Sequence, residues 1–147
     1  MGLIDRPDPD RVEEHAGFRA LVEALLEGNL RRVPARAMLI RHREASALVA
    51  MDAGVAVTIR MRPGAAREPG RVLVVDGEDP QAEIVVRAAS MALLELAAVP
   101  LRFGLPDVLT SGGRHILGAI VRRRIRVRGL VRHLGTVRRL SLLLSVR

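Results

Sequence analysis

The 147-residue sequence contains no cysteine, tryptophan, tyrosine or lysine, and only two phenylalanines. Without cysteine the chain cannot form disulfides or thiolate metal sites, which excludes disulfide-stapled secreted folds and favours a cytoplasmic location. Without tyrosine and tryptophan it lacks most of the platforms on which single-stranded bases stack. All 24 basic residues are arginine, which we attribute to a GC-rich, bacterial genome.

Two kinds of targeting segment are also missing. The first residues, MGLIDRPDPD, have neither the basic region nor the apolar region of a secretory signal. No charge-free apolar run approaches the ~18–20 residues that a membrane span needs. Hydrophobic residues make up 49% of the chain and charged residues 27%, which is globular composition. The length favours a single domain over residues 1–147.

The charges are unevenly distributed along the chain. Residues 1–100 hold 13 arginines and 15 acidic residues, whereas residues 101–147 hold 11 arginines and a single acid, Asp107. One end of the sequence is therefore strongly electropositive, which indicates an anionic partner or an anionic surface.

The apolar periodicity predicts helices and strands in a definite order. Residues 8–29 read as a helix with one apolar stripe, and residues 34–44 stay open between helix and strand. Four β-rich runs follow, at 48–51, 54–62, 71–77 and 82–88, and the turn residues between them favour an antiparallel meander. A helix with Ser90 as its cap comes next. It is followed by an irregular apolar loop at 100–113, which includes Phe103 and Val108, and by a short helix or turn at 114–121.

The arginine-rich segment that comes next has two faces. In RRRIRVRG, Ile125 and Val127 alternate with Arg124, Arg126 and Arg128, so aliphatics and arginines lie on opposite faces of a strand. From Leu130 onward, leucines and valines recur at helical spacing. The overall pattern predicts an α+β domain whose helices pack on one side of a sheet.

Three interpretations of the arginine face remain open: a solvated surface, docking onto anionic lipid, and nucleic-acid binding. The scarcity of aromatics and the lack of a helix-turn-helix or zinc-finger signature disfavour nucleic acid. Nucleic-acid binding would also predict an affinity that falls steeply with salt.

The sequence contains no recognisable catalytic constellation. Its four histidines are scattered without metal-ligand spacing, EEH at 13–15 is typical of a helical turn, and DGEDP at 76–80 of a simple turn. TSGGR at 110–114 is only a weak candidate for an anion nest, and no serine lies in a nucleophile-elbow motif. We therefore expect no enzyme activity, no cofactor and no metal.

Two segments contain more apolar residues than one buried helix face or an ordinary loop requires. The last helix ends in LSLLLSV, which is apolar nearly all the way round, and the loop PLRFGLP adds apolar residues where loops are usually polar. Tight core packing explains both features, and so does a cavity lined by aliphatic side chains.

Residues 82–147 resemble the second half of the sterol carrier protein type-2 family. The strand AEIVVRA leads to a helix with a central LL, at Met91–Leu96, and a basic-aliphatic strand at Arg124–Gly129 closes on glycine before a last amphipathic helix. The preceding helix and strands agree in order. The sequence departs from the family at Leu130, where an acidic residue is common, and in the long, proline-rich connection Ala97–Arg114.

The resemblance implies a five-stranded, mostly antiparallel sheet with helices on one face and a hydrophobic tunnel between them. Family members bind sterols, fatty acids or acyl-CoA esters noncovalently, and in some proteins the domain is instead a module of an enzyme. Our first hypothesis is therefore a lipid-binding or lipid-transfer protein. The alternative is a noncatalytic module that docks an enzyme or a second copy of itself through the terminal helix.

Both the aliphatic pattern and the resemblance suggest site residues. The candidate ligand-binding residues are Val57, Ile59, Leu73, Val75, Leu94, Leu109, Ile116, Leu117, Ile120, Leu140, Leu143 and Leu144. The residues expected to meet anionic headgroups or a membrane surface are Arg122, Arg123, Arg124, Arg126 and Arg128.

Overall fold

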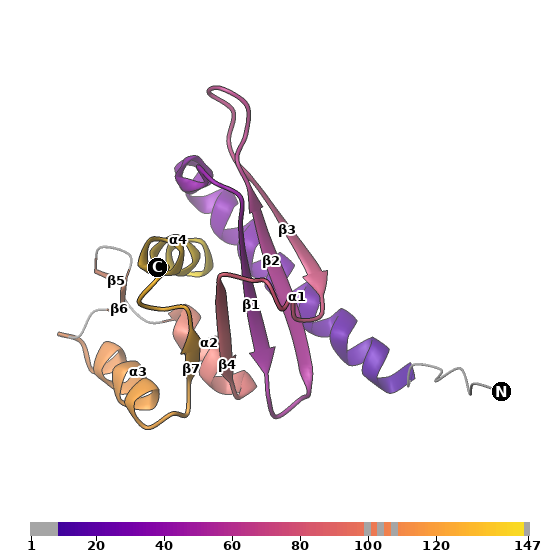
Figure 1. Ribbon diagram of the computed structural model, residues 1–147, viewed down its shortest axis with the longest axis vertical. Coiled ribbons are helices and arrows are strands. Elements are labelled where there is room, and N and C mark those ends of the chain that lie inside the picture. Colours follow the sequence, from indigo (N-terminus) through magenta and orange to yellow (C-terminus); the bar gives the residue numbers. More distant parts are fainter. Residues whose placement is uncertain (1–8, 99–100, 103–104, 107–108, 146–147) are drawn as a thin grey trace.

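The structure of the protein is a computed structural model that describes residues 9–98, 101–102, 105–106 and 109–145. Figure 1 shows a central sheet with helices around it. The helices are α1 (Pro9–Arg32), the 3-10 helix η1 (Pro34–Leu39), α2 (Ser90–Ala98), α3 (Ser111–Val121) and α4 (Leu134–Leu144). The strands are β1 (Glu44–Ala50), β2 (Val55–Arg62), β3 (Arg71–Asp76), β4 (Ile84–Ala88), β5 (Leu101–Arg102), β6 (Leu105–Pro106) and β7 (Arg126–Arg128).

The main sheet has five strands in the order β3-β2-β1-β4-β7. Its pairs are antiparallel except for β1 and β4, which run parallel. The expected α+β class with a mostly antiparallel sheet is therefore confirmed. The meander is correct for the first three strands and wrong for the fourth, because β4 crosses over to pair with β1.

The crossover connection, residues 77–83, is anchored on the outer face of the sheet. Thr58 is fully buried; its hydroxyl donates to the Gly77 carbonyl oxygen at 2.8 Å and accepts from the Asp79 amide at 2.9 Å. Beneath this connection lies a small cluster of Ala47, Ala82 and Val85. The connection thereby shields part of the outer face from water, and β4 can occupy an interior position that suits its apolar residues.

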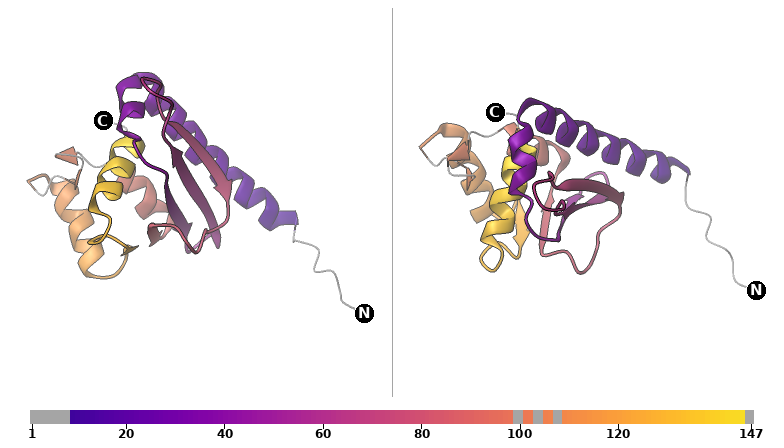
Figure 2. Two further views of the ribbon diagram at one scale, coloured as in Figure 1. Left: turned by 45° about the horizontal axis from the view of Figure 1, so that its top comes forward. Right: turned by 90° about the horizontal axis from the view of Figure 1, so that it is seen from above.

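The main core lies on the opposite, inner face. Antiparallel pairing places Ile59 opposite Val74, and both point toward the helices. Helices α1 and α4 pack against each other on this face, as the two views of Figure 2 show. Among the described residues, no helix has the length and apolar character needed to cross a membrane.

Side chains of other elements fix both ends of α4. Near its start, Glu44 of β1 accepts from Thr136 Oγ1 at 3.0 Å and from Arg139 Nε at 2.9 Å. These bonds to Glu44 raise the pKa of Arg139 above its ordinary value. At the C-terminal end, buried Asn29 donates to the Leu143 carbonyl at 2.9 Å, and Arg36 donates to the carbonyls of residues 142 and 145. Carbonyls that a helix leaves unpaired at its end are thus satisfied.

Helices α2 and α3 are attached by fewer contacts. Ser90, expected as the cap of α2, is its first residue, and its amide and hydroxyl both donate to Asp52 Oδ1 at 2.8 Å. The cap is therefore a carboxylate from the β1–β2 turn. An exposed pair, His115 Nε2 and Glu95 Oε2 at 3.4 Å, joins α3 to α2.

The segment before α3 differs from the loop that the sequence predicts. It contains the two short strands β5 and β6, which pair with each other. Phe103 and Val108, expected to add apolar surface there, lie outside the described residues. Thr110 caps α3, since its hydroxyl accepts from the Gly113 amide at 3.0 Å.

Gly129 makes the turn between β7 and the last helix. Its φ of 84° lies in the left-handed region, and a Cβ there would be only 2.1 Å from the carbonyl oxygen of Glu83. No side chain fits this position, which explains why the basic-aliphatic strand ends on glycine.

Candidate functional site

A cavity of about 440 Å³ lies between the inner face of the sheet and helices α1, α2 and α4. Its wall is almost entirely aliphatic. The lining residues are Glu14, Gly17, Phe18, Leu21, Val22, Leu25, Leu48, Ala53, Val55, Ile84, Val86, Ser90, Leu93, Leu94, Leu96, Ile120, Ile125, Val127, Leu130, Val137, Leu140, Ser141 and Leu144.

The periodicity of the elements explains this wall. The parallel register places Leu48 beside Val86, so both point to the inner face. On α4, residues 137, 140, 141 and 144 fall at the spacing of one helical face. The sheet and α4 thus present two aliphatic surfaces to the same space, and α2 covers it from the side.

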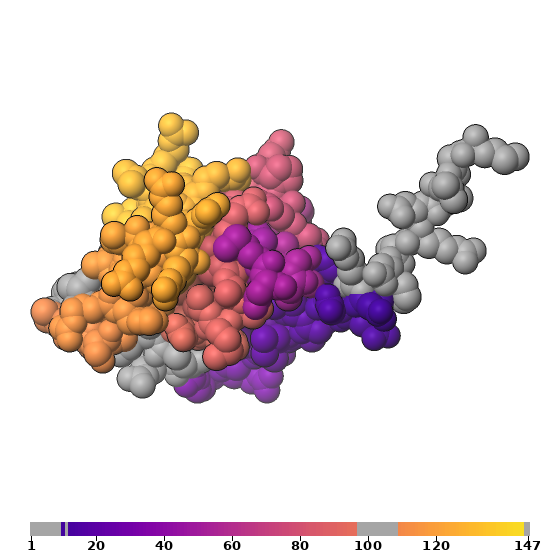
Figure 3. Space-filling view, turned by 90° about the horizontal axis from the view of Figure 1, so that it is seen from below, coloured from indigo at the N-terminus to yellow at the C-terminus, as the bar shows by residue number. Residues whose placement is uncertain are grey.

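The mouth of the cavity lies between α1 and α2, beside the β1–β2 turn. The wall residues that are exposed to solvent are confined to this end: Glu14, Gly17, Leu21, Ala53 and Leu94. In Figure 3, seen from this end, α1, the β1–β2 turn and the start of α2 form a continuous surface.

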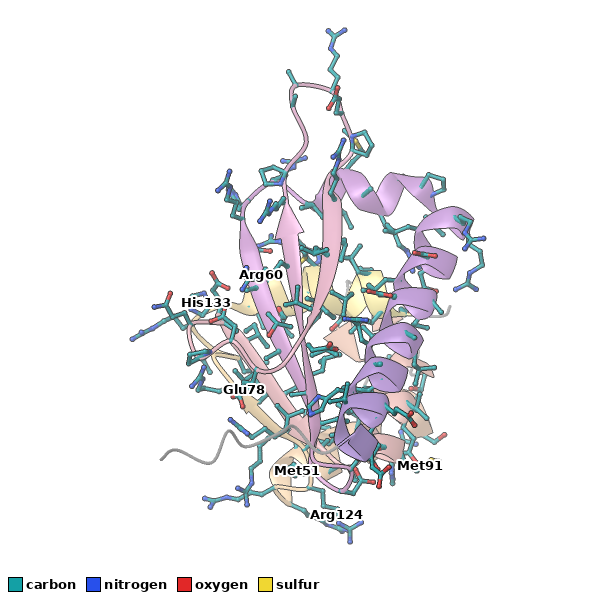
Figure 4. The ribbon with its side chains drawn as sticks, turned by 90° about the vertical axis from the view of Figure 1, so that its right-hand side faces the viewer. Met51, Arg60, Glu78, Met91, Arg124 and His133 are labelled. Carbon is teal, nitrogen blue, oxygen red and sulfur yellow. The ribbon has the colours of Figure 1, made fainter. Side chains whose placement is uncertain are left out.

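Exposed apolar side chains surround this end of the molecule. Met51 in the β1–β2 turn and Met91 at the start of α2 are 46% and 66% exposed. The Met51 amide donates to the Ala88 carbonyl at 2.9 Å, which brings the turn to the β4–α2 junction. Arg124 lies at the same end in Figure 4.

The charged side chain of the cavity wall is acidic. Among the described residues, Glu14 is the only charged residue of the wall, and neither arginine nor histidine lines it. Asp52 precedes Ala53 of the mouth, and the hydrogen bonds from Ser90 lower its pKa below the ordinary value. The described residues also contain no group of acidic or histidine side chains arranged to hold a metal.

Four of the twelve predicted ligand-binding residues line the cavity: Leu94, Ile120, Leu140 and Leu144. Four others are fully buried in the core without reaching it: Val57, Ile59, Ile116 and Leu143. The aliphatic pattern did not distinguish these four residues from wall residues, because the cavity occupies only the part of the inner face that α2 covers.

The remaining four predicted residues lie away from the cavity. Leu73 and Val75 point to the outer face, because the pairing of Ile59 with Val74 turns residues 72 and 74 inward. Leu109 and Leu117, 68% and 49% exposed, are not part of the wall. The assignment of β3 side chains to the inner face was thus wrong by one residue.

Sequence reasoning missed the contribution of α1. This helix supplies six wall residues, from Glu14 to Leu25, and Leu93 and Leu96 of α2 were also overlooked. The signal that could have found them is the apolar stripe of the first helix, none of whose residues is among the twelve candidates.

The five predicted surface arginines divide into three groups. Arg122, Arg123 and Arg124 are exposed in the α3–β7 turn, at the end that holds the mouth. Arg126 is exposed and pairs with Arg87 across β4 and β7. Arg128 donates to the carbonyls of Pro80 and Ala82 at 3.3 and 3.4 Å, and so holds the crossover connection.

Comparison with known proteins identifies the fold. No family model matches the sequence, and no curated protein matches it. Among solved structures, the "UbiJ-SCP2 Ubiquinone synthesis protein" matches with a TM-score of 0.55 and 18% identity over 86% of this chain and 92% of that chain. The inverting sec-alkylsulfatase Pisa1 from Pseudomonas sp. matches with a TM-score of 0.47 and 17% identity, over 70% of this chain and 13% of that one. The chain thus has the α+β fold of sterol carrier protein type-2 domains.

Proposed function

We propose that this protein is a noncatalytic lipid-binding protein that holds an apolar ligand in the cavity between the sheet and α2. The observation that carries the proposal is the aliphatic wall, which encloses about 440 Å³ and opens at one end. The polar side chains of the wall are Glu14, Ser90 and Ser141, which come from three different helices. Within the part of the chain that the structure describes, no hydrogen bond joins any two of them, which supports binding over catalysis. We also propose that the protein transfers this ligand between membranes.

Burial of hydrocarbon would supply the affinity. Each methylene removed from water contributes about 0.8 kcal/mol, so each added methylene strengthens binding about fourfold until the cavity is full. Because this driving force does not depend on charge, binding persists when salt is added.

The test uses N-phenyl-1-naphthylamine, an uncharged dye whose fluorescence rises in apolar sites. The purified protein is titrated with the dye at low salt and at about 0.5 M salt, where surface electrostatics is screened. We expect saturable binding of similar affinity at both salt concentrations. No saturable binding, or binding that disappears with salt, would contradict the proposal.

Matched variants test whether the dye binds in the cavity. Leu144→Phe fills the cavity from α4, and we expect it to weaken dye binding at least tenfold. Leu117→Phe makes the same change on the exposed surface of α3 and should leave binding unchanged. Because Leu144→Phe also affects packing, Leu94→Phe at the half-exposed mouth is the second test, with folding of each variant checked by circular dichroism.

The arginine turn extends the proposal to a membrane. Arg122, Arg123 and Arg124 lie at the end of the molecule that holds the mouth and exposed methionines. Anionic phospholipid attracts such arginines by about 1 kcal/mol each. Co-sedimentation with phosphatidylglycerol vesicles should therefore decrease in the variant with glutamine at these three positions, and equal sedimentation would remove the membrane from the proposal.

The accessory-module alternative remains a second proposal. Val131 and Leu134, at the start of α4, are 93% and 50% exposed, and a partner enzyme or a second copy would cover them. The structural neighbour named as a ubiquinone synthesis protein is compatible with an accessory role. Sedimentation velocity tests self-association, and a monomer at every concentration would exclude the second copy.

A further inference from the structure

The charge distribution along the cavity is one-sided. Every wall residue of α4, β7 and the sheet that the structure describes is uncharged, and the single charged side chain of the wall, Glu14, lies at the mouth. A carboxylate or phosphate drawn into this wall would lose its hydration without gaining a cationic partner. Burial of an unpaired charge is strongly unfavourable.

The mouth offers no free anion site either. A helix N-terminus binds anions through its amides, and α2 begins beside the mouth at Ser90. Asp52 already occupies this position, because its Oδ1 accepts from both the amide and the hydroxyl of Ser90 at 2.8 Å. An anionic headgroup would therefore meet the carboxylates of Glu14 and Asp52 at the entrance.

Exposed arginines lie at the same end of the molecule, in the α3–β7 turn: Arg122, Arg123 and Arg124. None of them is part of the cavity wall. The residue that follows them, Ile125, is 1% exposed and closes the wall on that side. The arginines can face a charged membrane while the ligand enters between α1 and α2.

Building on the proposed function, we infer that the cavity selects uncharged lipids, such as long-chain alcohols, and rejects fatty-acid carboxylates. The hydroxyl of Ser141 on α4 adds a neutral polar group to the otherwise aliphatic interior. It suits a hydroxyl or carbonyl group of the ligand and cannot balance a full charge. The selection therefore rests on two interactions: the carboxylates at the mouth repel an anionic headgroup, and the Ser141 hydroxyl attracts a neutral polar one.

The experiment displaces bound N-phenyl-1-naphthylamine with 1-decanol or with decanoate, which share one chain length and differ in headgroup charge. At about pH 8 the decanoate is fully ionised. We expect decanol to displace the dye at a concentration at least tenfold lower. An alcohol is also less hydrated than a carboxylate, so decanol would bind better even without repulsion at the mouth. The test of the inference is therefore how the ratio of the two displacing concentrations changes in variants.

Two variants remove the charges at the mouth and keep its shape. Glu14→Gln and Asp52→Asn should each lower the decanol preference several-fold by improving decanoate binding, while decanol binding stays constant. The Asp52→Asn side chain retains an oxygen that can cap α2. Glu13→Gln is the control, since Glu13 is exposed on the same helix and does not line the cavity.

The outcomes separate this inference from the function on which it rests. If the dye binds and decanoate displaces it as well as decanol does, the cavity binds lipid and the selection is wrong. Tighter decanoate binding that weakens with salt would likewise overturn the selection, and would assign the headgroup to the arginine turn. An unchanged ratio in the Glu14 and Asp52 variants would also contradict the role of these carboxylates. If neither the dye nor either ligand binds, the proposed function itself fails.

Discussion

The two sides of the cavity are built differently. Helix α4 is held at both ends by side chains from α1, η1 and β1, and the carboxylate of Glu44 and the amide of Asn29 that hold it are buried. Helix α2 is held by the exposed cap from Asp52, the exposed His115–Glu95 pair, and the half-buried Ala92, Leu93 and Leu96. One wall is therefore fixed, and the other is the part that local opening would release first.

This difference teaches how an apolar cavity can coexist with a folded core. Leucines of the fixed wall contribute to stability because they fill space. Leucines of the α2 wall face the cavity and are half-buried or exposed, so they contribute less to folding. Stability and access to the cavity thus depend on different elements of the fold.

The largest expected effect compares the same substitution on the two walls. Leu140 of α4 lines the cavity and is 5% exposed, so Leu140→Ala should lower the free energy of unfolding by about 3 kcal/mol. Leu93 of α2 is half-buried and faces the cavity, so Leu93→Ala should cost about 1 kcal/mol. Urea unfolding measures both values. Equal losses would show that the two walls do not differ in packing.

A smaller effect is expected from the polar attachment of α4. The Glu44 side chain is 9% exposed, and Arg139→Ala would leave its carboxylate buried without its cationic partner. We expect a loss of about 2 kcal/mol in urea unfolding. Arg138→Ala, at the exposed neighbouring position, should stay within about 0.5 kcal/mol of the wild type. If both variants unfold alike, the pair does not fix α4.

The smallest effect is a pH dependence at the cap of α2. Hydrogen bonds from Ser90 lower the pKa of Asp52 in the folded chain below its ordinary value of 3.8. The stabilisation is therefore present above that value and is lost as the pH falls through the lowered one. Asp52→Ala should be less stable than the wild type near neutral pH, and the two should converge under acid conditions.

Urea midpoints measured across this pH range provide the comparison. Asp52→Asn is the control, because its amide oxygen accepts the same hydrogen bonds without titrating. Its difference from Asp52→Ala should stay constant with pH. A wild-type advantage over Asp52→Ala that persists in acid would show that the carboxylate is not the source of the stabilisation.

The sequence predicts those parts of the fold in which apolar residues recur at the spacing of a helix or a strand. Alternation in residues 55–62 and 124–128, and the apolar stripe of the first helix, all correspond to elements of the structure. The parallel pairing of β1 with β4 could not be read in this way, because it depends on how residues 77–83 pack against Thr58 on the outer face. Long-range topology of this kind leaves little local signal.

The candidate site was harder to predict than the fold. Aliphatic residues look alike whether they fill a core, as Ile59 does, or face a cavity, as Leu93 does. The difference lies in how far α2 stands from the sheet, which no side-chain type encodes by itself. The acidic mouth also escaped notice, since Glu14 and Asp52 are distant in sequence and flank the cavity only in the folded chain.

Gly129 has a consequence for how such a sequence can diverge. Its backbone geometry and the nearby Glu83 carbonyl leave room for one amino acid out of twenty, whereas most wall positions of the cavity accept any aliphatic residue of suitable size. Substitutions can therefore change the wall while the backbone keeps its course, whereas position 129 tolerates no change. The residue that is least free to vary thus lies outside the cavity wall.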